Sequence, residues 1–209
     1  MSETEILVEL RQITVQKEGW TDSIERVGGF LSHVSLKVQA KALWLLGEMG
    51  LLHPKMVGHY VEAIADFMSA DESLLRERAL NALGRTGRGK HALIEPYLPQ
   101  MRQLASDSEP SVRLAFIWAC ENIATNAPEL FVRDMPLFAS LLGDENDRVR
   151  IEAPEIFRVL GKRKSEYVTP YLAKLQELSE SDPERVVRIH AAGAVRAARK
   201  GVIDHAADK

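Results

Sequence analysis

Cysteine, long apolar segments and aromatic side chains are all scarce in this sequence of 209 residues. The single cysteine, Cys120, cannot form an internal disulfide, and its apolar neighbours favour a buried, inert thiol. The most apolar run, residues 42–52, is interrupted by Glu48 and is too short to span a membrane. The first five residues include two glutamates and no basic residue, unlike the basic start of a secretory signal. These features favour a cytoplasmic protein.

The sequence also lacks an excess of charge of either sign. It carries 27 Lys and Arg against 30 Asp and Glu, a net charge of −3, and both signs are spread evenly along the chain. Proteins dedicated to nucleic-acid binding usually have a basic domain or tail, so the even distribution weakens that function. Hydrophobic residues make up 45% of the chain, which is enough to build a globular core.

What the sequence does contain is an internal repeat. An apolar anchor recurs with a spacing of 37 residues three times and then of 38, at Val38, Leu75, Val112, Val149 and Val187. Arginine follows the anchor in four copies, at Arg76, Arg113, Arg150 and Arg188, and Gln39 takes its place in the first copy. Aspartate precedes the arginine by six residues at Asp107, Asp144 and Asp182. A period of this length is typical of helical repeat proteins.

Each repeat has the pattern of two helices. After the anchor, apolar residues recur at helical spacing, as in Val112, Phe116 and Ile123. No segment alternates with the period of a strand, so the sequence predicts an all-α fold. Pro99 and Pro136, one repeat apart, predict a kink in the first helix of a repeat.

Glycine and proline also mark the second helices. Glycines lie near the ends of these helices, where we expect them to close the helix, at Gly47, Gly84, Gly87 and Gly161. Pro154 falls in the middle of the fourth second helix, where its missing amide should bend the helix.

The recurring aspartate and arginine have a structural interpretation. The aspartate stands just before the second helix, where its carboxylate can accept hydrogen bonds from the first-turn amides. The arginine lies within that helix, where it can reach an acid or a carbonyl of a neighbouring repeat. We therefore expect a ladder of charged contacts made by Asp107, Arg113, Asp144, Arg150, Asp182 and Arg188.

A unit of about 37 residues with an aspartate, then Val-Arg, alanine and Leu-Gly in its second helix, and a proline in its first, resembles the HEAT repeat. The resemblance implies a right-handed α-α superhelix of about five two-helix repeats of 37–38 residues plus an N-terminal capping helix. We expect a single domain, 1–209, with the capping helix in 1–19, the repeats in 20–200 and a polar tail in 201–209. Polar terminal caps favour a monomer.

Motifs that carry chemistry are weak. Residues 84–91 match part of a phosphate loop, but a helix precedes them and His91 replaces the Ser or Thr that holds magnesium. The repeat register places this segment in a turn between two repeats. The six histidines form no metal-binding pair, and the His-Glu pairs that hold di-iron in HEAT-type hydroxylases do not occur. No nucleophile has a local partner. We expect no catalytic, cofactor-binding or metal-binding residues.

Binding residues are expected on the second helices, which line the concave side in HEAT-like stacks. One aligned column contains Trp44, Asn81 and Trp118, and tryptophan and arginine are over-represented in interface hot spots. The alternative is that both tryptophan rings fold into the core between repeats. The predicted groove comprises Trp44, Arg78, Asn81, Arg85, Trp118, Asn122 and Glu155.

Three functions remain open from the sequence. The resemblance implies a non-catalytic scaffold or adaptor that holds a peptide or helix of a partner protein, since HEAT proteins are mostly binding surfaces. A nucleic-acid-binding protein similar to HEAT-like DNA glycosylases would use Trp44, Trp118 and Glu155 on a basic face. Basic residues near the ends of second helices, such as Arg85 and Lys162, suit that face, but they also suit the helix dipole. The third function is that of an accessory protein similar to HEAT-type bilin lyases.

Overall fold

The computed structural model describes the backbone of residues 1–207 and the side chains of residues 1–200. Within that part of the chain every regular element is helical and no strand occurs, so the predicted all-α repeat fold is confirmed. The chain divides into two compact units, Met1–Ala119 and Cys120–Lys209. Helix α8 (Pro110–Ala124) contributes residues to both units.

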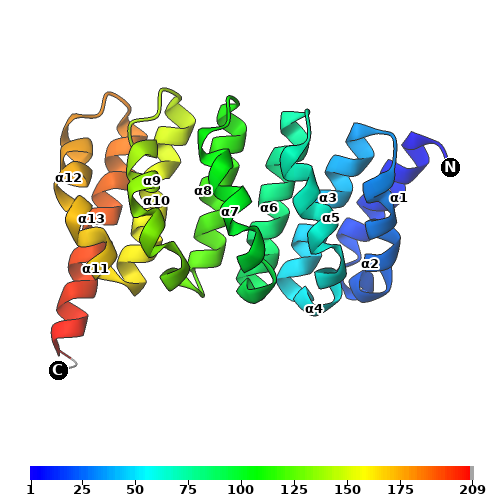
Figure 1. Cartoon of the computed structure of the whole chain (residues 1–209), viewed down its shortest axis with the longest axis horizontal. Coiled ribbons are helices and arrows are strands. Elements are labelled where there is room, and N and C mark those ends of the chain that lie inside the picture. The colour runs from blue at the N-terminus through cyan, green and yellow to red at the C-terminus, as the bar shows by residue number, and fades with distance from the viewer. Residues whose placement is uncertain (208–209) are drawn as a thin grey trace. The chain divides into compact units, whose positions relative to one another are not determined.

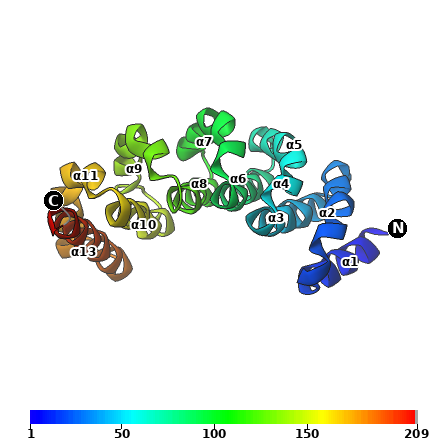
Figure 2. The same ribbon diagram turned by 90° about the horizontal axis from the view of Figure 1, so that it is seen from below.

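The first unit begins with α1 (Glu3–Val15), which corresponds to the expected capping helix. Ser2 and Glu5 close its start in a reciprocal capping box. The long helices α3 and α6 pack side by side in one layer, and α5 and α7 lie in a second layer (Figures 1 and 2). The helices after α1 are α2 (Trp20–Gly29), α3 (Leu36–Leu52), α4 (Pro54–Val57), α5 (Val61–Asp66), α6 (Ser73–Gly89) and α7 (Leu98–Gln103).

The second unit repeats this two-layer arrangement. Helices α10 and α13 pack against one another, and α12 packs on α13 (Figure 1). Helix α13 extends into the segment 201–209 that was predicted to be a polar tail, and the side chains of that segment lie outside the described residues. The helices are α9 (Met135–Leu141), α10 (Asp147–Arg163), α11 (Ser165–Val168), α12 (Leu172–Ser181) and α13 (Arg185–Ala207).

Short 3-10 turns divide the first helix of most repeats. In the third repeat, turns at His91–Leu93 and Glu95–Tyr97 precede α7, and another at Leu104–Ser106 follows it. Pro99 and Pro136 lie in the first turns of α7 and α9, where a missing amide costs no helical hydrogen bond. The prolines therefore begin a new helical segment instead of kinking a continuous one as predicted.

Three of the four predicted glycines, Gly47, Gly84 and Gly161, serve helix packing and not the predicted closure of helix ends. No described residue has the positive φ with which glycine closes a helix. Gly47 and Gly84 lie inside α3 and α6. A Cβ at these positions would lie 2.7 Å from Cα of Ala82 and 2.5 Å from Cα of Ala119, respectively. Glycine is required there because the neighbouring second helices approach too closely for a side chain.

Two segments of unusual sequence are helical, and the bend predicted at Pro154 stays a prediction. Helix α10 runs through Pro154, which is buried. Helix α6 continues to Gly89, so most of the glycine-rich segment 84–91 forms the last turns of a helix and not the predicted turn between repeats. A phosphate-binding loop lies between a strand and a helix, and this segment is itself helical.

Candidate functional site

One face of α3 carries a lysine stacked on a tryptophan. Lys37, Lys41 and Trp44 recur at helical spacing along this face. Nζ of Lys41 lies 3.9 Å from the centroid of the Trp44 ring. At this distance the ammonium group and the ring attract one another through a cation–π contact. The Trp44 side chain is half-buried, so part of the residue stays accessible at the surface.

The adjacent face of α6 completes a shallow pocket around this tryptophan. Leu74 and Arg78 of α6 line it together with the α3 residues, and its volume is about 380 Å³. The structure thus brings together Trp44 and Arg78 of the predicted groove and adds two lysines that the prediction did not include. We name this site the Trp44 pocket, and its lining residues are Lys37, Ala40, Lys41, Trp44, Leu74 and Arg78.

The Trp44 pocket is positively charged. Partial burial lowers the pKa of Lys41, and the nearby positive charges of Arg11 and Arg78 lower it further. Nη1 of Arg78 lies 3.2 Å from Oε1 of Glu77, which supplies one nearby negative charge. With Lys37, four cations lie in or beside the pocket, so a carboxylate placed there would be attracted.

Arg85, another predicted groove residue, is engaged within the protein. Its Nη2 in α6 donates to Oε2 of Glu48 in α3 at 2.5 Å. Its Nε is buried and has no hydrogen-bond partner in the described part of the chain. The ion pair offsets the charge of the arginine, so the positive patch ends one helical turn beyond Trp44.

The two tryptophans of the predicted groove differ in burial from the third. Trp20 is 2% exposed, and its indole N–H donates to the carbonyl oxygen of Ile13 at 2.7 Å. In contrast, Trp118 in α8 is 38% exposed, and Trp44 is half-buried. The alternative in which both groove tryptophans fold into the core therefore does not hold for Trp118. Asn81, from the same column, is half-buried on α6.

The second unit contains the other two predicted groove residues. Asn122 is half-buried in α8, whereas Glu155 is buried in α10. The Glu155 carboxylate accepts a hydrogen bond from Nε of Arg158 and forms an ion pair with its Nη2. Its Oε1 also lies 3.3 Å from Nδ1 of His190, which is close enough for an ion pair. The two atoms are not hydrogen-bonded, because Nδ1 of His190 has no hydrogen-bond partner within residues 1–200. Glu155 thus belongs to an internal charged cluster.

Glu121 in α8 is a largely buried carboxyl group of the same cluster that sequence reasoning missed. Its pKa rises from 4.5 to about 9, mainly because the group is buried and also because Glu152 and Glu155 lie nearby, while Arg158 lowers it. Its Oε1 is buried without a hydrogen-bond partner in the described part. Glu121 is therefore protonated at neutral pH. A signal existed in the sequence, because Glu121 lies one repeat of 37 residues after Gly84, where the first two repeats have glycine.

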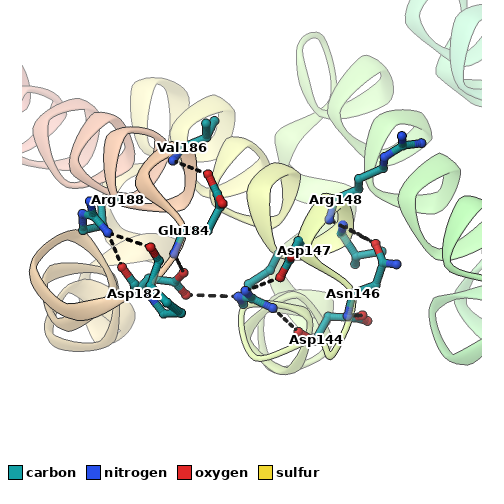
Figure 3. Close-up of polar contacts among 11 residues, drawn as sticks. Asp144, Asn146, Asp147, Arg148, Asp182, Glu184, Val186 and Arg188 are labelled. Atoms are coloured by element: carbon teal, nitrogen blue, oxygen red, sulfur yellow. Dashed lines mark hydrogen bonds and ion pairs between the residues drawn. The ribbon is translucent and has the colours of Figure 1, made fainter.

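The recurring arginines tie loops and neighbouring repeats together. In the second unit, Nε of Arg150 donates to Oδ2 of Asp182 at 3.1 Å, and its Nη1 donates to the carbonyl oxygen of Asp144 at 2.9 Å. Nη1 of Arg188 donates to the carbonyl oxygen of Asp182 at 2.5 Å (Figure 3). Both arginines hold the loop of their own repeat, and Arg150 also reaches the aspartate of the next repeat.

The first unit contains the same contacts. Nε and Nη2 of Arg76 donate to the two carboxylate oxygens of Asp107 at 2.7 and 2.8 Å. Nη1 of Arg113 donates to the carbonyl oxygen of Asp107 at 2.8 Å. In the first repeat Gln39 replaces the arginine, and Ala70 stands where the next repeat would supply its aspartate. The arginine and its acidic partner are thus absent together.

The aspartates lie before the helix caps and do not accept from first-turn amides as predicted. Oδ1 of Asp144 accepts from the amide of Asn146 at 2.8 Å, and the Asn146 side chain caps α10 by accepting from two first-turn amides (Figure 3). Asp107 and Asp182 likewise accept from the amide two residues further on. The aspartate therefore shapes the loop that leads into the helix.

The other sequence expectations concern metals, membranes and the cysteine. Among residues 1–200, no group of three or more His, Cys, Asp or Glu side chains could hold a metal ion. No helix of the described backbone is both long and apolar enough to cross a membrane. Cys120 is buried, with 1% of its surface exposed.

Comparison with known proteins places the chain by its fold. Residues 98–196 match the family model of HEAT repeats, and no curated protein matches the sequence. An engineered protein solved by the Northeast Structural Genomics Consortium is similar, with a TM-score of 0.70 and 17% identity over 92% of this chain and 85% of that one. A designed armadillo repeat protein in complex with peptide (KR)4 has a TM-score of 0.67 and 18% identity over 94% of both chains. The chain therefore has the fold of a HEAT-like repeat solenoid, the helical repeat architecture that these engineered and designed proteins also show.

Proposed function

We propose that this chain is a non-catalytic protein-binding module, a scaffold or adaptor that holds a peptide or helix of a partner protein against its second helices. The observation that carries the proposal is the position of Trp44 and Trp118 in one column of the first unit, with both residues partly exposed and Asn81 between them in register. Surface tryptophans offer a large apolar area to a partner and are frequent in binding hot spots.

The second helices suit this role because they hold side chains at regular intervals. Glycine contacts such as that of Gly47 bring α3 and α6 close together, so their columns keep a defined spacing. Each added repeat supplies one more helix with equivalent positions, which matches the regular side-chain spacing of a bound peptide. The designed armadillo repeat protein of similar fold was solved with a bound peptide, which supports peptide binding as a use of this architecture.

In the first unit, the proposed binding residues are Trp44, Arg78, Asn81, Arg85 and Trp118. Asn122 and Glu155 belong to the second unit, and their part in binding stays a prediction. The burial of Glu155 beside Arg158 favours a structural role for this carboxylate.

Nucleic-acid binding is the alternative that the geometry favours less. Two basic residues near the ends of second helices, Arg85 and Arg158, are already paired with Glu48 and Glu155. A phosphate backbone gains affinity from cations that it can neutralise, and a cation paired with a carboxylate contributes less.

A pull-down from the source lysate, with and without nuclease, tests the proposal. The test variant is Trp44→Ala/Trp118→Ala. The matched control is Met56→Ala/Val132→Ala, which removes two exposed apolar side chains that lie outside the second helices. We expect a protein partner that resists nuclease, is retained by the control and is lost in the test variant. Circular dichroism must show that both variants remain helical. Recovery of nuclease-sensitive nucleic acid, or equal recovery of the partner by both variants, would refute the proposal.

A further inference from the structure

We propose that the Trp44 pocket receives an acidic segment of the partner protein, in which glutamate or aspartate residues flank an aliphatic side chain. This inference rests on the proposed function, because it names the chemistry of the segment that part of the same face would bind. The pocket combines positive charge with an apolar lining, and the segment has to match both.

The positive charge comes from side chains that acids of the first unit do not fully offset. Lys37 and Lys41 form no ion pair with an acid within residues 1–200, and Lys41 is instead stacked on the Trp44 ring. Arg78 directs Nη1 towards Glu77, and a guanidinium group has further donors for a ligand. A carboxylate placed between Lys41 and Arg78 would be attracted to both cations and would reduce the repulsion between them. Both effects favour binding of an acidic side chain.

The apolar lining comes from Ala40, Leu74 and the ring of Trp44. A volume of about 380 Å³ accepts an aliphatic side chain, and burial of that side chain against these apolar atoms favours binding. Highly charged segments without an apolar residue would leave this surface uncovered. The expected segment is therefore acidic and amphipathic.

The geometry favours an acidic peptide over a nucleic acid. The cations are gathered at one pocket, and the patch ends at the ion pair between Arg85 and Glu48. A nucleic-acid backbone binds through many phosphate contacts along a continuous basic track. The designed armadillo protein binds the basic peptide (KR)4. Charge complementarity at the Trp44 pocket of this chain predicts a peptide of the opposite charge.

Fluorescence anisotropy with three labelled peptides tests the inference on the full chain. The peptides alternate leucine with glutamate, glutamine or lysine, so they differ in charge and share the same apolar residue. We expect the glutamate peptide to bind about tenfold or more tightly than the glutamine peptide, and the lysine peptide to bind most weakly. The preference for glutamate should shrink as salt is raised, because the charges are partly exposed.

Two charge-reversal variants locate the binding. Lys41→Glu should weaken the glutamate peptide by about tenfold or more. Lys55→Glu changes the net charge by the same amount but alters an exposed residue of α4, outside the pocket, so it should bind like the wild type. Arg78→Gln, a milder change on the α6 side of the pocket, should also weaken binding, and circular dichroism monitors folding of every variant.

The outcomes separate this inference from the proposed function. If the glutamine or lysine peptide binds as tightly as the glutamate peptide, the inference of an acidic segment is overturned. If the binding of that peptide is also lost in Trp44→Ala, the proposed protein-binding function is still supported. Equal weakening by Lys41→Glu and Lys55→Glu also overturns the inference, because the attraction would then be a property of net charge. A short thymidine oligonucleotide that displaces the glutamate peptide at equal concentration would overturn it in favour of nucleic acid.

Discussion

Replacing Glu121 by glutamine removes a carboxyl group whose ionisation opposes folding. Glu121 lies in α8 with Oε1 buried, and the ionisable groups that act on it are Glu152, Glu155 and Arg158. Burial and the two neighbouring glutamates raise its pKa from 4.5 to about 9. Glutamine has nearly the same shape as the protonated side chain but does not ionise. The substitution therefore tests the charge state of this site with little change in packing.

The sign and size of the effect follow from proton linkage. Because the folded pKa of Glu121 is raised, its contribution to stability is fully present below the unfolded value of 4.5 and is lost as the pH rises towards about 9. In that window folding takes up one proton, and the free energy of unfolding falls by about 1.4 kcal/mol per pH unit. Between pH 5 and pH 7 the loss amounts to about 2–3 kcal/mol. Because some stability is already lost at pH 5, Glu121→Gln should regain about 3–4 kcal/mol at pH 7 and little below pH 4.5.

Urea unfolding followed by circular dichroism across this pH range measures the effect. The relevant quantity is the difference in unfolding free energy between variant and wild type, since the other ionisable groups largely cancel in it. Glu166→Gln, at an exposed position of α11, serves as the matched control and should show no such pH dependence. A difference between Glu121→Gln and wild type that stays constant from pH 5 to pH 8 would show that Glu121 is not a neutral buried acid, and the reasoning would fail.

Three further predictions concern packing, the charged ladder and surface exposure. Gly84→Ala should lower the free energy of unfolding by about 1–3 kcal/mol in urea titrations, because its Cβ would lie 2.5 Å from a Cα of the next helix; Gly19→Ala, with no atom within 4 Å, should not. Arg76→Lys should lower the free energy of unfolding by about 1–3 kcal/mol, since the single nitrogen of lysine cannot reproduce the two parallel hydrogen bonds that Nε and Nη2 make with Asp107. A double-mutant cycle with Asp107→Asn should give a clear coupling energy. Trp118→Phe should remove the emission that acrylamide quenches most readily, since this residue is 38% exposed; unchanged quenching would contradict its position.

The helical repeat was predictable because its signals are local and recur in register. The spacing of the apolar residues after Val112 indicates which side of the helix faces the core. It can be read from one repeat without knowledge of the next. The period of 37 residues then implies that equivalent helices pack on one another. The column with Trp44 and Trp118 could be aligned for the same reason, and so could the recurring aspartate and arginine.

Contacts between repeats were less predictable, because they depend on distances that a one-dimensional pattern does not contain. Glycine near a helix end usually closes the helix, but Gly84 serves a helix contact that becomes visible only when α6 and α8 are placed together. Asp144 stands before a helix as a cap would, but α10 begins three residues later and Asn146 takes that role. The local sequence is compatible with either role for Gly84 and for Asp144. Only the positions of the neighbouring backbone segments show which role each residue has.

The sequence by itself determined the fold class, the repeat length and the residues that share a column, since these follow from helical periodicity. Tertiary structure decided which of those residues are exposed to solvent and which contact one another. Trp118 stays exposed, Arg78 of the next repeat lines a pocket with Trp44, and Glu121 loses its charge. Exposure and pKa both depend on the atoms that neighbouring helices place around a side chain, and those atoms come from segments a full repeat away in the chain.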